Sequence, residues 1–123
     1  MRFIVMVKGA ENSPAGRPPL KLMQAIGQLG EEAAKAGAFV ETGGLLPTAM
    51  GARVRLASGE MTVMDGPFTE AKEVIGGYAI YQVNSKAEAI AWTKRFLDLH
   101  KEHWPGWDGE CEIRQLMEGP PSC

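Results

Sequence analysis

The chain has 123 residues, a formal net charge of −2 at pH 7, and 45% hydrophobic and 23% charged residues. This length and mixture fit one globular domain with its own core. No run of Lys or Arg is long enough to follow a phosphate backbone, and no apolar run reaches the ~20 residues that cross a bilayer. Nucleic-acid and membrane partners are therefore not expected.

A strand, a long loop and a helix are predicted first. Residues 3–7 form a continuous apolar run, typical of a strand covered on both faces. Lys8 ends this run too early for a signal peptide, so we expect a cytoplasmic protein. Residues 9–19 are rich in Gly, Pro and polar side chains, and are long enough to cover a site as a flap. Residues 19–36 show helical spacing of apolar side chains, and Gly37 suits the left-handed residue that closes a helix.

Further strands and a hairpin are predicted in the middle of the chain. Residues 39–45 have an extended pattern, and Ser58-Gly59 is a two-residue hairpin signal between 52–57 and 60–64. Residues 74–83 form the strongest predicted strand, although Gly76-Gly77 indicates a bulge or a close approach by a ligand or second chain. Its apolar side chains occupy both faces, with Tyr78 and Ile80 on one and Ile75, Tyr81 and Val83 on the other.

A second helix and a last strand complete the predicted order. Ser85 and Glu88 form a capping-box pattern at the start of a helix, and residues 110–117 alternate as a strand does. The order predicts an α+β fold of ferredoxin-like βαβ-βαβ plan with an extra β-hairpin. We expect one domain over residues 1–118 and a frayed tail over residues 119–123.

Two helices can cover only one face of the predicted sheet. The strand at 74–83 is apolar on both faces, so the second face needs a partner. Two such sheets packed face to face would bury both apolar faces. The pattern therefore predicts a homodimer.

Residues 64–78, which read Met-Asp-Gly-Pro-Phe-Thr-Glu-Ala-Lys-Glu-Val-Ile-Gly-Gly-Tyr, resemble the signature of the YCII-related family in its DGPF-containing branch. Residues 51–55 match the hairpin that usually precedes this signature, and residues 109–114 resemble the closing strand of the branch. The resemblance implies a dimeric α-β barrel whose members are mostly uncharacterised. The wider family's proposed His and Asp pair is not carried over, because neither His lies early in this chain.

Asp65 and Lys72 are the candidate catalytic residues. Asp65 is explained by turn formation in Asp-Gly-Pro-Phe, or alternatively by a carboxylate that lines a pocket and moves a proton. Lys72 is either a solvated charge before the strand or an anchor for an anion. The candidate ligand-binding residues are Arg53, Arg55, Phe68, Glu73 and Tyr78.

The end of the second helix carries His100, His103, Trp104 and Trp107. Two histidines without a third ligand are a weak metal signal, and a polar helix end explains them better. The tryptophans are either interface anchors or the wall of an apolar pocket, and we favour the interface. Neither cysteine has metal-ligand spacing, and a disulfide between Cys111 and Cys123 is not expected in a reducing compartment.

Three functions stay open at this point. The first is binding of an unknown small molecule in a cleft near the DGPF turn, with neither cofactor nor metal. The second is an acid/base enzyme of small-molecule metabolism that works without a cofactor. The third is a regulatory or structural interaction dimer, which the resemblance links to alternative sigma factors.

Overall fold

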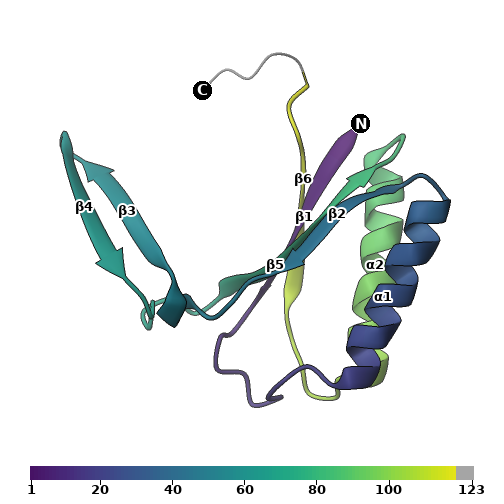
Figure 1. Cartoon of the computed structure of the whole chain (residues 1–123), viewed down its shortest axis with the longest axis horizontal. Helices are drawn as coiled ribbons and strands as arrows, with labels where there is room; N and C mark the ends of the chain where they lie inside the picture. Colours follow the sequence, from purple (N-terminus) through teal and green to yellow (C-terminus); the bar gives the residue numbers. More distant parts are fainter. Residues whose placement is uncertain (119–123) are drawn as a thin grey trace.

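Six strands and two α-helices follow one another along residues 1–118, the part of the chain that the computed structural model describes (Figure 1). The predicted tail at residues 119–123 lies outside it. The elements are β1 (Arg2–Gly9), α1 (Leu20–Lys35), β2 (Phe39–Gly44), the 3-10 helix η1 (Thr48–Met50), β3 (Ala52–Ala57), β4 (Glu60–Asp65), β5 (Val74–Gln82), α2 (Lys86–His103) and β6 (Glu110–Gln115). Within these residues, no helix is both long and apolar enough to pass through a bilayer.

Four strands form an antiparallel sheet in the order β2-β5-β1-β6, and β3 and β4 pair separately as a hairpin. Both helices lie on the same side of the four-stranded sheet (Figure 1). The α+β architecture, the inserted hairpin and the one-sided helical cover are therefore confirmed. The sheet's helix-facing side and the helices form one core, which includes the buried residues Phe3, Val5, Ala33, Ala38, Tyr81, Val83 and Ala89.

Local signals at the helix ends behave as predicted. The Ser85 hydroxyl accepts a hydrogen bond from the Glu88 N–H at 3.2 Å, and the Glu88 carboxylate accepts one from the Asn84 N–H at 3.3 Å. Both bonds satisfy backbone donors near the start of α2. Gly37 follows α1 with φ of +73°, the left-handed region that favours glycine.

The glycine pair in β5 marks an irregularity of the sheet. Gly77 pairs with Val7, but the next pair along the strands is Ile75 with Lys8, so Gly76 is the extra residue of a bulge. The predicted bulge is therefore confirmed. The shift also brings Ile75 into register with Lys8, which corrects the assignment of Ile75 to the face that carries Tyr81.

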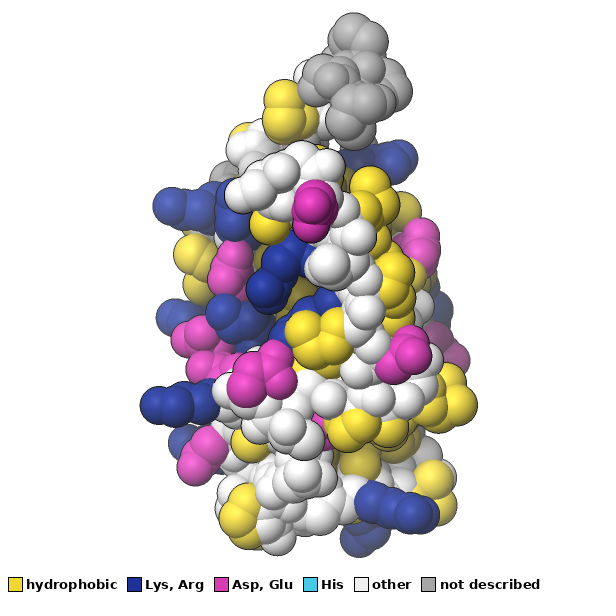
Figure 2. Space-filling model, turned by 90° about the vertical axis from the view of Figure 1, so that its left-hand side faces the viewer, with side chains coloured by type: hydrophobic (Ala, Val, Ile, Leu, Met, Phe, Trp, Pro, Cys, Tyr) yellow, Lys and Arg dark blue, Asp and Glu magenta, His cyan; other side chains and the backbone are white. Residues whose placement is uncertain are grey.

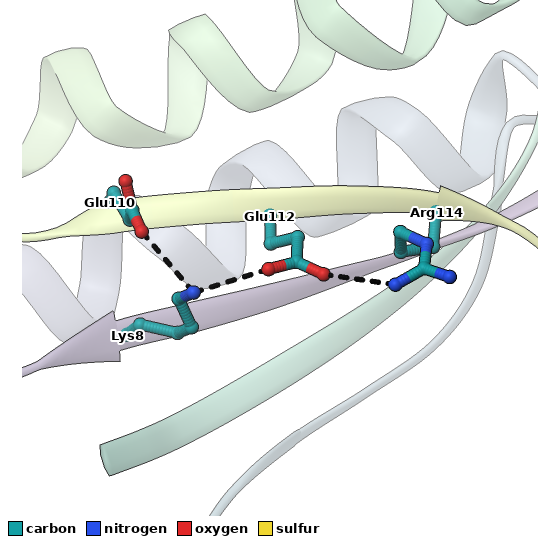
Figure 3. A network of polar contacts seen from close by, with 4 residues as sticks. All are labelled: Lys8, Glu110, Glu112 and Arg114. Atoms are coloured by element: carbon teal, nitrogen blue, oxygen red, sulfur yellow. Dashed lines mark hydrogen bonds and ion pairs between the residues drawn. The ribbon is translucent and has the colours of Figure 1, made fainter. Parts of the chain in front are cut away.

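The second face of the sheet has no helix over it. Its centre is apolar, because Ile4 pairs with Ile80 and Met6 with Tyr78 across β1 and β5. Beside this apolar centre lies a charged network on β1 and β6 (Figure 3). The Lys8 ammonium lies 3.2 Å from a Glu110 carboxylate oxygen and 3.1 Å from one of Glu112, and the Arg114 guanidinium lies 3.2 Å from Glu112. We call the whole second face of the sheet, with its apolar centre and this charged network, the open face.

The hairpin of β3 and β4 projects away from the body of the molecule (Figure 1). Its register pairs Val54 with Val63 and Leu56 with Met61, which places all four on one face with exposed fractions of 64–69%. Figure 2 looks at the side from which the hairpin projects and shows hydrophobic side chains at the surface among charged ones. A two-stranded ribbon is marginally stable alone, so this apolar face is a candidate contact surface.

The Asp-Gly-Pro-Phe turn after β4 packs tightly against η1. A Cβ added to Gly66 would lie 1.6 Å from the Thr48 carbonyl oxygen, far inside van der Waals contact. The Gly66 N–H donates to the Gly51 carbonyl at 2.9 Å, and the Phe68 N–H donates to the Thr48 hydroxyl at 3.1 Å. Only glycine therefore fits at the second position of this turn.

The substitution Gly66→Ala should lower the free energy of unfolding by about 2–3 kcal/mol, because backbone atoms must move to admit the methyl group. The matched control is Gly27→Ala on α1, where an added Cβ meets nothing within 4 Å. This control should raise the free energy of unfolding by roughly 0.5–1 kcal/mol through helix propensity. Chemical denaturation of both variants measures the difference, and equal stabilities would contradict the packing argument.

Candidate functional site

A cavity of about 630 Å³ lies between the helix-facing side of the sheet, both helices and the loop between β1 and α1. Its walls are mainly apolar, and its polar lining groups are few. The polar and aromatic residues of the lining include Arg17, Thr48, Tyr81, Thr93, Phe96, His100, Trp104 and Trp107.

Missing side chains in the sheet contribute to the space. Gly44 pairs with Gly77, and Gly77 pairs with Val7, so these positions share the helix-facing side of the sheet. A Cβ added to Gly44 would meet nothing within 4 Å. Because both glycines line the cavity, the sheet floor is left without side chains at the end where β2 and β5 meet.

The loop between β1 and α1 is fastened over the cavity at two points. On one side, the Trp104 indole N–H donates to the Ala15 carbonyl at 3.0 Å. On the other, the Glu11 carboxylate accepts from the Thr48 backbone N–H and hydroxyl, each at 2.6 Å, and these bonds lower the pKa of Glu11. The loop therefore covers a cavity, and its role as a flap over a site stays a prediction.

His100 is a buried polar side chain of the cavity, with an exposed fraction of 6%. Its Nδ1 lies 3.0 Å from the Phe96 carbonyl oxygen. A carbonyl can only accept, so in the neutral ring Nδ1 carries the hydrogen and Nε2 is the acceptor. Burial lowers the pKa of His100 below its ordinary value near 6.5, against the opposing effect of the bond to Phe96.

Aromatic rings surround the His100 imidazole. The ring centroids of Phe96 and Trp107 each lie 4.6 Å from it, and that of Trp104 lies 6.1 Å away. The two indoles stack on each other with centroids 5.7 Å apart. A Cβ added to Gly109 would lie 2.4 Å from the Trp107 ring, so a glycine is required for that indole to lie where it does.

Tyr81 and Thr93 are the other buried polar residues of the wall. Thr93 donates its hydroxyl hydrogen to the Ala89 carbonyl at 2.8 Å, and burial raises the pKa of Tyr81. Within residues 1–118, every fully occluded side-chain nitrogen or oxygen has a hydrogen-bond partner. The Tyr81 hydroxyl and Nε2 of His100 have none there, so both atoms retain accessible surface, which we assign to the cavity that both residues line.

The sequence-predicted site residues lie mostly outside this cavity. Of Asp65, Lys72, Arg53, Arg55, Phe68, Glu73 and Tyr78, all within the described part of the chain, only Tyr78 lines it. Asp65, Lys72, Arg55 and Glu73 are exposed. The structure therefore does not enclose Asp65 with Lys72, and their catalytic role stays a prediction.

Two of these residues do meet at the base of the hairpin. The Arg53 guanidinium lies over the Phe68 ring, 4.0 Å from its centroid, and forms an ion pair with Glu70. The Tyr78 hydroxyl donates to the Glu41 carboxylate, which raises the pKa of Tyr78. Arg53 and Phe68 thus make a local packing cluster, which accounts for both side chains without a ligand.

Sequence reasoning missed the importance of His100. The prediction of a polar helix end is wrong for this residue, because it is buried, and the tryptophans line a cavity inside the subunit. The available signal was spacing, since Ala89, Thr93, Phe96 and His100 follow one another at steps of four and three along α2.

Metal-ligating groups do not gather in the described part of the chain, where no three His, Cys, Asp or Glu side chains come together. Cys111 is half-buried on β6, and burial raises the pKa of its thiol to about 11. It is therefore a protonated thiol at neutral pH. Cys123 lies outside the described residues.

Comparison with known proteins gives a family and one relative. The family model of the YCII-related domain matches residues 1–96. An uncharacterised protein of Rhizobium meliloti (strain 1021) is 31% identical over 96 residues, which cover 78% of this chain and 73% of that protein. The matched region includes the sheet floor and the loop over the cavity but ends before His100, Trp104 and Trp107.

A testable consequence of this geometry is the titration of His100. Its neutral ring should show the form protonated at Nδ1, and its pKa should lie below 6.5. The unfolded chain then binds more protons as pH falls, so stability should be lost from about pH 6.5 down to the folded pKa, with no further loss from this residue below it.

Nitrogen-15 NMR of the imidazoles over a pH series measures both the tautomer and the pKa. Urea unfolding at the same pH values, compared with His100→Gln, isolates the contribution of His100 to stability. A pKa at or above 6.5 would contradict the burial argument.

Proposed function

The chain belongs to the YCII-related domain family, and from that premise and the geometry of the cavity we propose that it binds a small molecule between its sheet and helices. The single observation that carries the proposal is a cavity of about 630 Å³ lined by the largely buried residues Tyr81 and His100, whose hydroxyl and Nε2 retain accessible surface. Ligand sites commonly occupy roughly 300–1,000 Å³, with apolar walls and a few converging polar groups.

The cavity adjoins the Asp-Gly-Pro-Phe turn through Thr48. The Thr48 hydroxyl donates to Glu11 on the loop over the cavity and accepts from the N–H of Phe68 in the turn. Gly66 closes on the Thr48 carbonyl from the other side. We propose assignment to the DGPF branch from the sequence motif, and these contacts support a role for the turn in holding the cavity wall.

The two alternatives have less support. An acid/base enzyme that uses Asp65 would need a second titratable group facing it, whereas Asp65 is exposed at the end of β4. A regulatory dimer that acts with an alternative sigma factor rests on the family resemblance alone. Both stay predictions, and Asp65→Asn, which should leave ligand affinity unchanged, tests the first.

We also propose that a second copy of the chain covers the open face. Its apolar centre of Ile4, Met6, Tyr78 and Ile80 has no helix over it, and all four residues are only partly buried within the subunit. The charges beside that centre are already paired with one another, so a partner could cover them without leaving an unpaired ion (Figure 3). The apolar face of the hairpin would add to the buried area.

Filling the cavity should abolish ligand binding. Gly44→Leu places a side chain over the glycine floor without an initial clash, and Gly27→Leu on α1 is the matched control outside the cavity. A library of small metabolites and aromatic fragments, screened by thermal shift and NMR, should give hits with wild type and Gly27→Leu. The same hits should bind Gly44→Leu at least about tenfold more weakly, since their contact area is lost. Undiminished binding to Gly44→Leu would place the site elsewhere.

Charging the open face should dissociate the subunits. Ile80→Asp puts a carboxylate at the centre of the apolar surface, whereas Ile90→Asp puts one on α2, at a position that is already exposed. Sedimentation at micromolar concentration should show a dimer for wild type and Ile90→Asp, and a monomer for Ile80→Asp. A monomeric wild type would overturn the proposal.

A further inference from the structure

We infer that the cavity takes an uncharged aromatic alcohol or phenol whose hydroxyl donates a hydrogen bond to Nε2 of His100 and whose ring packs against the indoles of Trp104 and Trp107. This inference rests on the proposed binding function and adds the chemical class of the ligand. Four observations carry it: the direction of the imidazole, the charge of the site, the aromatic walls and the second polar group.

The orientation of the His100 imidazole is fixed by a backbone carbonyl of its own helix, α2. The 3.0 Å contact of Nδ1 with the Phe96 carbonyl assigns the ring hydrogen to Nδ1. The remaining nitrogen, Nε2, is then an acceptor without a partner among residues 1–118, in a side chain that is only 6% exposed. Because no fully occluded side-chain nitrogen or oxygen of residues 1–118 lacks a partner, Nε2 keeps accessible surface, and a ligand hydroxyl can take the place of water as its donor.

The charge of the site disfavours an anion. His100 in its neutral form offers no N–H toward the cavity, and its burial opposes the charged form. The Glu11 carboxylate at the loop is negative and already accepts two bonds from Thr48. Arg17 is the cation of the lining, but it is exposed on the loop, where water screens it.

The walls around Nε2 suit a flat ring. Phe96, Trp104 and Trp107 surround the imidazole, with centroids 4.6–6.1 Å from it. Aromatic rings pair favourably at such separations in stacked or edge-on arrangements. The Tyr81 hydroxyl, on the sheet side of the cavity, can either donate or accept, so it would complement the hydroxyl oxygen of a phenol or a second polar substituent.

Three matched probes test the inference, namely 2-naphthol, 2-methoxynaphthalene and 2-naphthoate. They share one ring system and differ in offering a donor, an acceptor only, or a negative charge. Their affinities for the full chain are measured by NMR titration, followed at the indole N–H signals of Trp104 and Trp107 and at the imidazole nitrogens of His100. We expect 2-naphthol to bind about five- to tenfold more tightly than either of the other two, the effect of one hydrogen bond to a buried acceptor.

Variants of His100 separate the hydrogen bond from general packing. His100→Leu should remove the preference for 2-naphthol over 2-methoxynaphthalene, and His100→Gln should restore part of it, because an amide oxygen can accept. His103→Leu is the matched control, since His103 does not line the cavity. Should His100→Leu fail to fold, the shift of the Nε2 signal of wild type on binding 2-naphthol decides the question by itself.

The outcomes separate the failure of the proposed ligand class from the failure of the proposed small-molecule binding. Equal affinities for 2-naphthol and 2-methoxynaphthalene, lost together in Gly44→Leu, would overturn the role of His100 and leave the binding cavity intact. Tightest binding of 2-naphthoate would overturn the neutral-ligand class. Binding of none of the three would also overturn the inference, and the metabolite screen with Gly44→Leu would then decide the binding function separately.

Discussion

The hydrogen bond between Nδ1 of His100 and the carbonyl of Phe96 is the interaction on which the cavity depends. It allows a polar ring to be buried in the last turns of α2 at small cost, because one of its nitrogens is satisfied inside the helix itself. The ring so placed contacts the indole of Trp107 and, beyond it, that of Trp104, whose N–H holds the loop at Ala15. Without this bond, the aromatic wall and one fastening of the loop would lose their support.

The opposite wall depends on Thr48 in a similar way. Its hydroxyl joins the loop, through Glu11, to the Asp-Gly-Pro-Phe turn, through the N–H of Phe68. The turn therefore acts on the cavity indirectly, by fixing a wall residue, whereas Asp65 is exposed and does not line the cavity. The motif can thus shape a cavity that it does not line, because Gly66 must lack a side chain for the carbonyl of Thr48 to lie where it does.

The fold could be predicted from the sequence because its signals are local and periodic. The capping pair Ser85 and Glu88, the Ser58-Gly59 turn and the glycine bulge in β5 each specify backbone geometry within a few residues. The site could not be predicted in the same way, because it is formed by contacts between distant segments. The bond of Trp104 to Ala15 and that of Thr48 to Glu11 leave no periodic trace, and a buried histidine at a helix end has the same sequence pattern as an exposed one.

The sheet has an apolar surface on each side, and the two are covered differently. On the helix-facing side, the loop closes over the space left by Gly44 and Gly77, so the surface is kept as a cavity of ligand size. On the open face no helix or loop of the described residues covers the sheet, and only another large surface can exclude water from it. Tyr78 lies on the strand that separates the two surfaces, because it pairs with Met6 on the open face and also lines the cavity.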